Sequence, residues 1–317
     1  MKILVTPTSL QPGKPSDALT ALQNFSNNLV FNTTGKPLAE DDLIPLLKDC
    51  DGYIAGLDFV TKRVLDACSN LKIISRYGAG YDRVDISAAK EKGIVVTNTP
   101  GVNAQAVGEL ALGLILSIAR NIPALNNQTR AGKWVRSTGM ELKGKTLGIM
   151  GLGAIGKVVA QGAQGLGMTV IAYDPYINKT YCQEHHIESA SFEAVIRRSN
   201  VISLHLPLLP ETKHIINANT LAQIPEGTII VNTSRGGIID EAAAYNALKS
   251  GKLGGLGLDA FALEPPIGSP LLELEHVVVT PHTGAHTREA TENMANTSVQ
   301  NLIDVLSGNA CPFIVNK

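Results

Sequence analysis

Three residues in the second half of the chain have side chains suited to proton transfer and carboxylate binding. Arg235, Glu264 and His282 each follow a short apolar run that suits a buried strand. An arginine can hold a carboxylate through two parallel hydrogen bonds. A histidine that titrates near neutrality can give a proton to a carbonyl oxygen, and a glutamate beside it would raise its pKa. Together they predict a site that binds a carboxylate and moves a proton to or from a neighbouring carbonyl or alcohol oxygen.

Each of these residues also has a structural interpretation when it is taken alone. Arg235 would then be a surface arginine in a turn, and His282 a hydrogen-bonded structural histidine. Asp259 and Glu264 would be turn-forming acids ahead of the proline pair at 265–266. The catalytic interpretation gains weight because the three candidates follow strand ends of one predicted α/β unit. Ligands of open parallel sheets bind outside those ends.

A glycine-rich turn opens that unit. Gly151, Gly153 and Gly156 fit the spacing G-x-G-x-x-G, after an apolar run at 146–150 and before helix-compatible residues at 157–165. One glycine allows the tight turn, the next lets the backbone approach a pyrophosphate, and the third lets helix and strand pack closely. The helix N-terminus then offers unpaired N–H groups to the phosphates. The stretch predicts dinucleotide binding, with a purely structural glycine turn as the alternative.

An acidic residue after the next predicted strand bears on the choice of cofactor. Residues 168–173 form an apolar run, and Asp174 follows it. A carboxylate at this place accepts hydrogen bonds from ribose hydroxyls and repels a 2′-phosphate. Lys179 is the only basic residue among 175–180. The sequence therefore predicts NAD rather than NADP.

The elements that must position these residues alternate between apolar runs and helix-compatible stretches, which predicts parallel sheets covered by helices on both faces. The expected strands are 2–5, 29–31, 53–55, 73–74, 94–96, 146–150, 168–173, 201–204, 228–231, 255–259 and 277–279. The expected helices are 41–48, 61–67, 87–92, 103–120, 157–165, 192–198, 218–223, 241–249 and 287–306. A polar interval at 121–145 and a tail at 312–317 complete the chain.

The length of 317 residues exceeds one ordinary core and predicts two domains. The expected fold class is α/β, with two doubly wound parallel-sheet (Rossmann-like) domains separated by an active-site cleft. A breaker at 99–101 suggests the first boundary. Because the last predicted helix is long for its position, we expect it to return to the first unit. The predicted domains are 1–99 plus 287–317 for the substrate and 100–286 for the dinucleotide.

Composition and charge argue against several classes of protein. The 27 Lys and Arg residues balance 28 Asp and Glu residues, without a long run of either sign, and 4% of residues are aromatic. This argues against nucleic-acid binding. The cysteines at 50, 68, 182 and 311 form no C-x-x-C pair, so we expect reduced thiols, a cytoplasmic protein and no metal site. The most apolar stretch, 110–119, is about half a membrane span, so no membrane association is expected.

From the loop at 78–80 to about residue 290 the chain resembles the D-isomer-specific 2-hydroxyacid dehydrogenases, and among them it is most similar to the phosphoglycerate dehydrogenases. Several motifs in order carry the resemblance, which makes it more specific than any single motif. They are RYGAG at 76–80, NTPG at 98–101, GELA at 108–111, the glycine turn, LHLP at 204–207 with Thr212, NTSRG at 232–236, LD at 258–259 and PHTG at 281–284.

The resemblance implies roles for individual residues. Arg235 would bind the substrate carboxylate and polarise the carbonyl, His282 would be the acid/base, and Glu264 would orient and charge His282. Backbone N–H groups at Ala79 and Gly80 would hold the carboxylate from the first domain. The other residues implied to contact cofactor or substrate, besides the three glycines, are Arg76, Ala154, Ile155, Asp174, Pro207, Thr212, Thr233, Asp259 and Gly284.

The substrate is less constrained than the reaction. Phosphoglycerate dehydrogenases of this family usually carry an arginine in the loop after the strand that is here 53–55. Residues 56–61 hold no arginine, and Asp58 among them would repel a phosphate. Arg76, and Arg136 after the only tryptophan, remain as candidates for a phosphate contact. Phosphoglycerate dehydrogenase is the first expectation for the activity, and a hydroxypyruvate or glyoxylate reductase is the alternative.

The resemblance also implies a homodimer, with residues 103–145 in the contact. The same scaffold serves some transcriptional corepressors, which sense NAD without turnover and usually carry extra terminal segments. The printed chain begins at its first predicted strand and ends at Lys317, so we expect an enzyme without C-terminal regulatory domains. An NAD-sensing binding protein is the alternative from another class. Formate dehydrogenase is a weaker alternative, because oxidising formate needs no histidine-mediated proton transfer.

Overall fold

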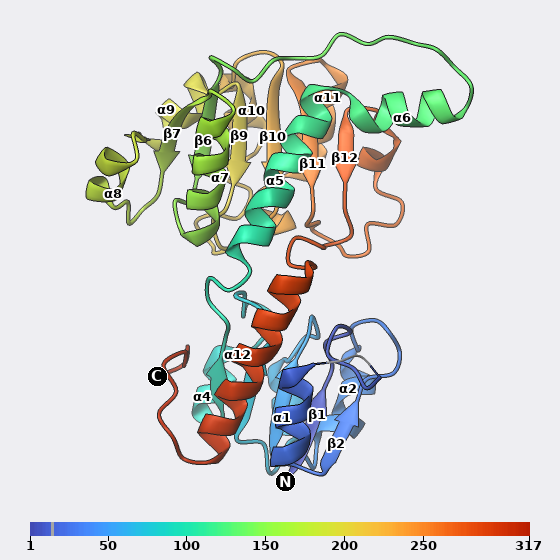
Figure 1. Ribbon diagram of the computed structural model, residues 1–317, viewed down its shortest axis with the longest axis vertical. Helices are drawn as coiled ribbons and strands as arrows, with labels where there is room; N and C mark the ends of the chain where they lie inside the picture. Colours follow the sequence, from blue (N-terminus) through green and yellow to red (C-terminus); the bar gives the residue numbers. More distant parts are fainter. Residues whose placement is uncertain (14–15) are drawn as a thin grey trace. The chain divides into compact units, whose positions relative to one another are not determined.

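The computed structural model describes residues 1–13 and 16–317, and these residues divide into two compact units. The first unit comprises Met1–Asn103 and Ala285–Lys317, and the second comprises Ala104–Gly284. The first unit is therefore built from both ends of the chain and the second from its middle (Figure 1). The predicted limits, after residue 99 and before residue 287, lie within a few residues of this division.

The first unit contains a parallel sheet with the strand order β2-β1-β3-β4-β5. Side chains alternate between the two faces of a strand, so Ile3 and Val5 enter one apolar core while Leu4 enters the other. The predicted sheet with both faces covered is confirmed for this unit. Its strands are β1 (Lys2–Val5), β2 (Asn28–Phe31), β3 (Gly52–Ala55), β4 (Ile73–Arg76) and β5 (Val95–Thr97).

Helices cover both faces of this sheet. On one face α12 packs against α1 (Figure 1), and it also contacts β3 and β4. It places Ala295, Val299 and Leu302 against Ile54 and Ile73, so the last helix of the chain completes the core of the first unit. The helices of this unit are α1 (Asp17–Phe25), α2 (Glu40–Leu47), α3 (Lys62–Asp66), α4 (Ile86–Glu91) and α12 (Arg288–Leu306).

The second unit contains a larger parallel sheet with the order β12-β11-β10-β9-β6-β7-β8. From β6 the chain builds outward first through β7 and β8, and then on the other side through β9 to β12. Such a reversal marks the place where doubly wound sheets bind dinucleotides. The strands are β6 (Thr146–Met150), β7 (Thr169–Tyr173), β8 (Glu188–Ser189), β9 (Val201–Leu204), β10 (Thr228–Asn232), β11 (Leu253–Leu258) and β12 (Val277–Val279).

The helices of the second unit also form two layers. Helices α5 and α7 bury apolar side chains in one core, and α9, α10 and α11 contribute to the core on the opposite face. They are α5 (Ala104–Ala119), α6 (Ile122–Arg130), α7 (Ala154–Gly165), α8 (Lys179–Glu184), α9 (Phe192–Arg198), α10 (Ala218–Gln223) and α11 (Glu241–Lys249), with short 3-10 turns at η1 (Gly236–Ile238) and η2 (Pro270–Glu273).

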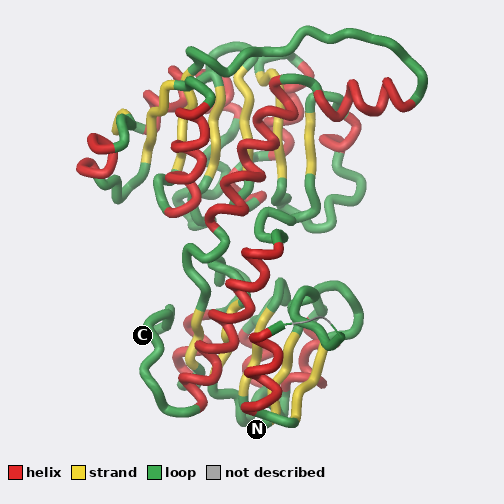
Figure 2. Tube along the Cα trace, viewed as in Figure 1, coloured by secondary structure: helices red, strands yellow, loops and turns green. Residues whose placement is uncertain are grey.

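Some elements differ from the sequence expectation. Helices α1 and α8 and the short strand β8 were not expected, and α6 lies in the polar interval 121–145, for which no helix was predicted. No residue of α6 is buried, and the helix is only 9 residues long, so neither packing nor length marks it in the sequence. Figure 2 shows the stretch between α6 and β6 as one long loop. The tail at 312–317 is ordered against β5, where Ile314 forms an antiparallel bridge with Thr97.

One finding concerns membranes. Within the described ranges, no single helix is long and apolar enough to cross a bilayer. The pair α5 and α6 passes the same test of length and composition only when the two are taken together, across a bend of 63°.

Candidate active site

The three glycine positions of the turn after β6 differ in how much room each leaves for a side chain. Gly151 has a φ of +97°, and a Cβ there would lie 2.7 Å from the carbonyl oxygen of His205. A Cβ on Gly156 would lie 2.2 Å from the carbonyl oxygen of Gly151. At Gly153, in contrast, no atom of the described chain lies within 4 Å of the Cβ position. Packing therefore demands the outer two glycines, while the middle one faces open space into which a pyrophosphate fits.

Helix α7 begins at this open glycine, and no side chain caps it. Its first residue, Ala154, is exposed, so the helix N-terminus is accessible to an anion. Asp174 follows β7, and its carboxylate accepts hydrogen bonds from the N–H groups of Leu152 and Tyr176, both at 2.8 Å. These bonds hold a negative charge beside the glycine turn. There the carboxylate can accept hydrogen bonds from ribose hydroxyls, and its charge would repel a 2′-phosphate.

Two threonines that were expected at the cofactor have different surroundings. The Thr212 hydroxyl donates to the carbonyl of Pro207 at 2.6 Å and accepts from the N–H of Leu209 at 2.8 Å. It therefore shapes the turn after β9. The hydroxyl oxygen of Thr233, after β10, is buried and has no hydrogen-bond partner in the described chain. A buried polar atom left unpaired at the end of a central strand, together with the open turn at Gly153, fits a bound dinucleotide.

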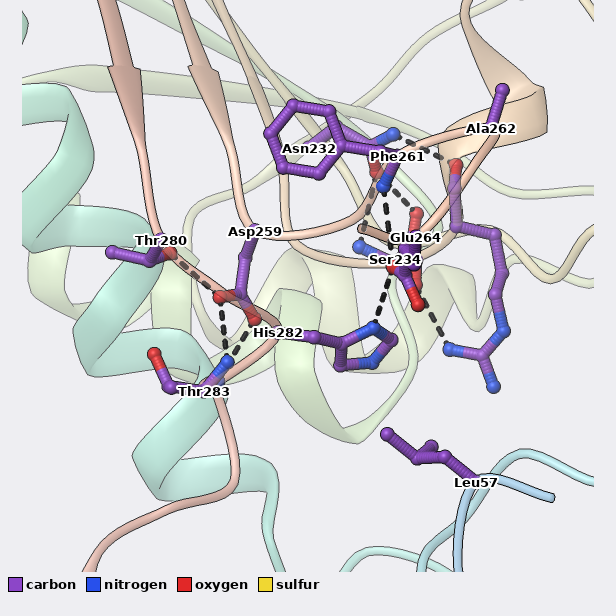
Figure 3. Close-up of polar contacts among 12 residues, drawn as sticks. Leu57, Asn232, Ser234, Asp259, Phe261, Ala262, Glu264, Thr280, His282 and Thr283 are labelled. Carbon is purple, nitrogen blue, oxygen red and sulfur yellow. Dashed lines mark hydrogen bonds and ion pairs between the residues drawn. The ribbon is translucent and has the colours of Figure 1, made fainter. Parts of the chain in front are cut away.

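Glu264 and His282 lie on different loops and meet at hydrogen-bond distance. Oε1 of Glu264 lies 2.8 Å from Nδ1 of His282 and accepts from the N–H of Phe261 at 3.2 Å (Figure 3). The two side chains are only 20% and 25% exposed. The other ring nitrogen, Nε2, makes no hydrogen bond within the described residues. The carboxylate orients the imidazole through Nδ1 and leaves Nε2 for a substrate, as an acid/base histidine requires.

Asp259 holds the loop on which His282 lies. Its side chain is 2% exposed, and its Oδ1 accepts from the Thr280 hydroxyl at 2.6 Å and the Thr283 N–H at 2.8 Å (Figure 3). Its Oδ2 accepts from the Gly284 N–H at 2.8 Å. His282 lies between these anchors with a φ of 54°, which a non-glycine residue keeps only when its surroundings enforce it. A carboxylate has about four acceptor sites, so one on Oδ2 remains for the predicted cofactor contact.

The turn that carries Arg235 is braced by Asn232. The Asn232 Oδ1 accepts from the N–H and the hydroxyl of Ser234 at 3.0 and 2.7 Å, and its Nδ2 donates to the Arg235 carbonyl at 2.8 Å (Figure 3). The half-buried guanidinium donates to the Ser234 carbonyl at 2.9 Å. Sequence reasoning missed this residue. An asparagine directly after a strand and two residues before a serine is the signal of an Asx turn, which could have identified it.

A close backbone contact joins the loops of Arg235 and Glu264. A Cβ on Gly236 would lie 1.8 Å from the carbonyl carbon of Phe261, so only glycine fits at this position. The contact sets the loop after β10 directly against the loop after β11. No group of three or more His, Cys, Asp or Glu residues able to hold a metal ion occurs in the parts of the chain that the structure describes.

In the first unit, Arg76 supports a loop from the inside, which differs from its expected role at the substrate. It is 3% exposed, its Nη1 donates to the carbonyl of Ala55 at 2.6 Å, and its Nε donates to the carbonyl of Gly80 at 3.2 Å. A buried guanidinium needs acceptors for its donors, and these carbonyl oxygens supply them. Arg76 is thus a positioning residue.

The loop 78–80 turns its carbonyl groups inward. The Gly78 carbonyl accepts from the N–H of Thr99 at 3.1 Å, and the Ala79 carbonyl accepts from Nδ2 of Asn98 at 2.7 Å. In a trans peptide the N–H points away from the carbonyl of the preceding residue, so the N–H groups of Ala79 and Gly80 point the other way. Neither has an acceptor among the described residues. Adjacent N–H groups without acceptors can bind an anion, and their role at the substrate carboxylate stays a prediction.

Asp58 does not face a substrate either, contrary to the expectation that it would repel a phosphate. It is 1% exposed and accepts from the N–H of Leu38 at 2.6 Å, the hydroxyl of Tyr53 at 2.8 Å and the hydroxyl of Thr6. Burial first, and the Asp58 charge second, raise the pKa of Tyr53 well above its ordinary value. The acid pins the loop after β3 to the core because a buried carboxylate needs these donors.

The chain is similar in sequence to known NAD-binding dehydrogenases. Residues 112–284 match the family model described as D-isomer specific 2-hydroxyacid dehydrogenase, NAD binding domain. A D-3-phosphoglycerate dehydrogenase of Methanocaldococcus jannaschii is 41% identical over 100% of this chain, but this chain spans only 59% of that protein. A hydroxypyruvate reductase of Thermotoga maritima is 42% identical over 90% of this chain and 94% of its own length.

A solved structure extends the likeness to the whole chain. The crystal structure of D-lactate dehydrogenase from Aquifex aeolicus, complexed with NAD and lactic acid, is 26% identical and has a TM-score of 0.85. The alignment covers 100% of this chain and 99% of the other. Since the family model matches the NAD-binding unit that holds Arg235, Glu264 and His282, and since full-length relatives carry the likeness through the rest, the chain belongs to the D-isomer specific 2-hydroxyacid dehydrogenases.

Proposed function

We propose that the protein interconverts a D-2-hydroxy acid and its 2-oxo acid with NAD. The observation that carries this proposal is the 2.8 Å contact between Glu264 and His282, at the carboxyl edge of the sheet whose strand β6 runs into the glycine turn. The glycine turn at 151–156 and Asp174 would hold the NAD, which when bound would supply the hydride for C2 of the oxo acid or accept it in the reverse direction. His282 gives the accompanying proton from Nε2 to the carbonyl oxygen and takes it back from the alcohol.

The other groups would bind and orient the acid. Arg235 would hold the carboxylate and stabilise negative charge on the carbonyl oxygen, while the N–H groups of Ala79 and Gly80 would bind the carboxylate as well. Replacing Arg235 with alanine should lower kcat/KM roughly a hundredfold or more, the usual loss for a charge-stabilising group. Arg235→Lys is the matched variant, since it keeps the charge and loses the two-pronged fork. Near-normal turnover of Arg235→Ala would contradict the mechanism.

The first candidate activity is that of a phosphoglycerate dehydrogenase, as in the archaeal relative. A specific observation supports the second candidate, reduction of hydroxypyruvate or glyoxylate. Arg76 uses donors on internal carbonyl groups, and the loop after β3 presents a half-buried Leu57 and an exposed Phe59 where an arginine would be expected. An uncharged substituent on the substrate suits such a loop better than a phosphate.

A panel of 2-oxo acids decides between the candidates. NADH consumption would be followed with 3-phosphohydroxypyruvate, hydroxypyruvate, glyoxylate and pyruvate, and the values of kcat/KM compared. A phosphate preference would support the first candidate, and a preference for the unphosphorylated acids the second. NADH binding without turnover of any acid would contradict the enzymatic proposal and favour an NAD-sensing protein.

We further propose a homodimer whose contact includes α6 and the loop that follows it. No residue of α6 is buried, all residues from 131 to 139 are exposed, and Trp134 is 85% exposed. Large apolar side chains gathered on one exposed element are typical of protein interfaces. Sedimentation should show a dimer for the native chain and a shift toward monomer for Trp134→Ser. Leu166→Ser, which changes an exposed apolar residue just after α7, should leave the dimer intact. A monomeric native protein would refute the proposal.

The cytoplasmic location also belongs to this proposal. All four cysteines are free thiols, which suits a reducing compartment. Fractionation of the source cells would test it, and recovery of the protein outside the cytoplasmic fraction would refute it.

A further inference from the structure

The anion-binding loop 78–80 depends on a side chain outside it. Asn98, just after β5, donates from Nδ2 to the Ala79 carbonyl at 2.7 Å. Since the peptide between Ala79 and Gly80 is planar and trans, holding that carbonyl inward directs the Gly80 N–H outward. Whatever fixes the orientation of Asn98 therefore fixes one of the two donors of the anion site.

The main chain of Asn98 is held on both sides. Its N–H donates to the carbonyl of Phe313 at 3.3 Å, and its own carbonyl accepts from Nδ2 of Asn301 on α12 at 3.0 Å. Asn301 also accepts, through Oδ1, from the Cys311 thiol at 3.5 Å. Asn98 and Asn301 are 8% and 2% exposed, so these bonds are shielded from competing water.

The segment 311–317 reaches Asn98 because it docks along the open edge of β5. The N–H of Val315 donates to the carbonyl of Val96 at 2.9 Å. The carboxamide of Asn316 then acts like a further peptide group of an added strand. Its Oδ1 accepts from the N–H of Val96 at 2.8 Å, and its Nδ2 donates to the carbonyl of Ile94 at 2.7 Å. A polar connection thus runs from this segment through Asn98 to the anion site.

We propose that the segment 311–317, together with Asn301, is a positioning element of the substrate site that sets the direction of the Gly80 N–H through Asn98. The proposal rests on the proposed function, because that function assigns the loop 78–80 to a substrate carboxylate. The positioning role gives the segment 311–317 and Asn301 an effect on substrate affinity, whereas the sequence predicted only a tail and a helix there. It predicts that changes in the segment alter binding of the acid and leave the cofactor unaffected.

The test uses oxamate, a 2-oxo acid mimic that cannot be reduced, bound to the complex of the full chain with NADH. Asn301→Asp replaces the donor to the Asn98 carbonyl by a carboxyl oxygen of similar size and places an ionisable group at a buried position. It should raise the oxamate Kd, and the KM for the best 2-oxo acid, about tenfold, because a buried acceptor loses its partner. The NADH Kd should stay unchanged, and kcat should change less than KM.

Two further variants make the result specific. Asn316→Ala removes the bonds that hold the segment to β5 at a distance from the loop, and should raise the oxamate Kd in the same direction by a smaller factor. If Asn301→Asp does not fold, the oxamate Kd of Asn316→Ala tests the positioning role instead. Asn296→Ala changes an exposed asparagine on the same helix and should leave every constant unchanged.

The outcomes separate this proposal from the proposed function. An unchanged oxamate Kd in folded variants would overturn the positioning role. So would equal losses of oxamate and NADH affinity, which indicate general destabilisation, or a native complex that does not bind oxamate. A native protein that binds NADH and oxamate but reduces no 2-oxo acid would contradict only the proposed function, and the variants would still be judged by their oxamate Kd.

Discussion

Some residues of the site have polar atoms that a reactant could reach, and in others the polar atoms already make hydrogen bonds within the protein. His282 offers Nε2, whereas Asp259 has three of its acceptor sites filled by the loop 280–284. Arg76 and Asp58 are charged residues of the kind that binds ligands, and both are used to hold loops. Residue type alone therefore overstates how many groups meet the substrate, because a buried charge must first be satisfied by its neighbours.

The charge on Glu264 should matter for the rate. Glu264→Gln keeps the shape of the side chain and removes the negative charge facing Nδ1 of His282. We expect kcat to fall roughly 10- to 100-fold, because the imidazolium loses its stabilising partner and its fixed orientation. Steady-state NADH oxidation would measure this, with unchanged NADH binding as a check on folding. Glu292→Gln, an exposed change on α12, is the control, and an unaltered kcat in Glu264→Gln would refute the role.

At the scale of secondary structure, the candidate site is formed by loops that follow the carboxyl ends of strands. The loops after β6, β7, β10, β11 and β12 carry the glycine turn, Asp174, Arg235, Glu264 and His282, and these strands all run parallel in one sheet. The carboxyl ends of parallel strands share one edge, so residues far apart in sequence are collected there. Two close contacts, at Gly156 and Gly236, then set how tightly neighbouring segments approach.

An added methyl group should lower NADH affinity at Gly153 and the stability of the fold at Gly156. Gly153→Ala places the methyl in open space, with a φ of −76° that alanine accepts, so the midpoint of thermal unfolding should not change. The NADH Kd should rise about tenfold or more, because the methyl occupies the place of the pyrophosphate. Gly156→Ala drives the methyl into the Gly151 carbonyl and should destabilise the protein by about 1–3 kcal/mol.

Calorimetry and NADH titration of both variants would check this pair. Native NADH affinity in Gly153→Ala would show that the phosphate lies elsewhere. Native stability in Gly156→Ala would show that α7 and the turn can separate without cost.

The strands and the nucleotide turn could be predicted from the sequence because their signals are local. The apolar runs at 146–150, 201–204 and 277–279 coincide with β6, β9 and β12. Residue type and position after predicted strands identified Glu264 and His282, which the structure brings into contact. The direction of the N–H groups at 78–80 depends on Asn98, Asn301 and the segment 311–317, and such pairings between distant segments leave no periodic pattern.

At the scale of the whole molecule, each unit has its own apolar cores on both faces of its sheet. Stability against unfolding should depend on pH through His205 in the second unit. Its Nδ1 is buried without a partner in the described chain, its Nε2 lies 2.8 Å from the Ser203 hydroxyl, and burial lowers its pKa from 6.5 to about 4. The folded protein thus keeps this ring neutral where the unfolded chain would protonate it.

Acidification from pH 6.5 to 4 should therefore cost stability. In that window the unfolded state binds a proton that the folded state does not, so the free energy of unfolding falls as the pH falls. At pH 5 the loss through His205 should be up to about 2 kcal/mol. Urea unfolding at pH 7 and pH 5 should show a smaller loss for His205→Asn than for the native chain. His186→Asn, at an exposed histidine, should behave like the native protein, and equal losses in all three would exclude His205 as the cause.

The division of the first unit between the two ends of the chain has a consequence for synthesis. The strands β1 to β5 are complete when Thr97 has been made, but the core around Ile54 and Ile73 lacks the α12 side chains until that helix follows. About 200 further residues must be translated first, which takes roughly 10 to 40 s at ribosomal rates of about 5–20 residues per second. During this time the second unit can fold within its own chain segment, while an apolar sheet face waits open on the nascent protein. Apolar surface exposed in this way makes a nascent chain prone to aggregation.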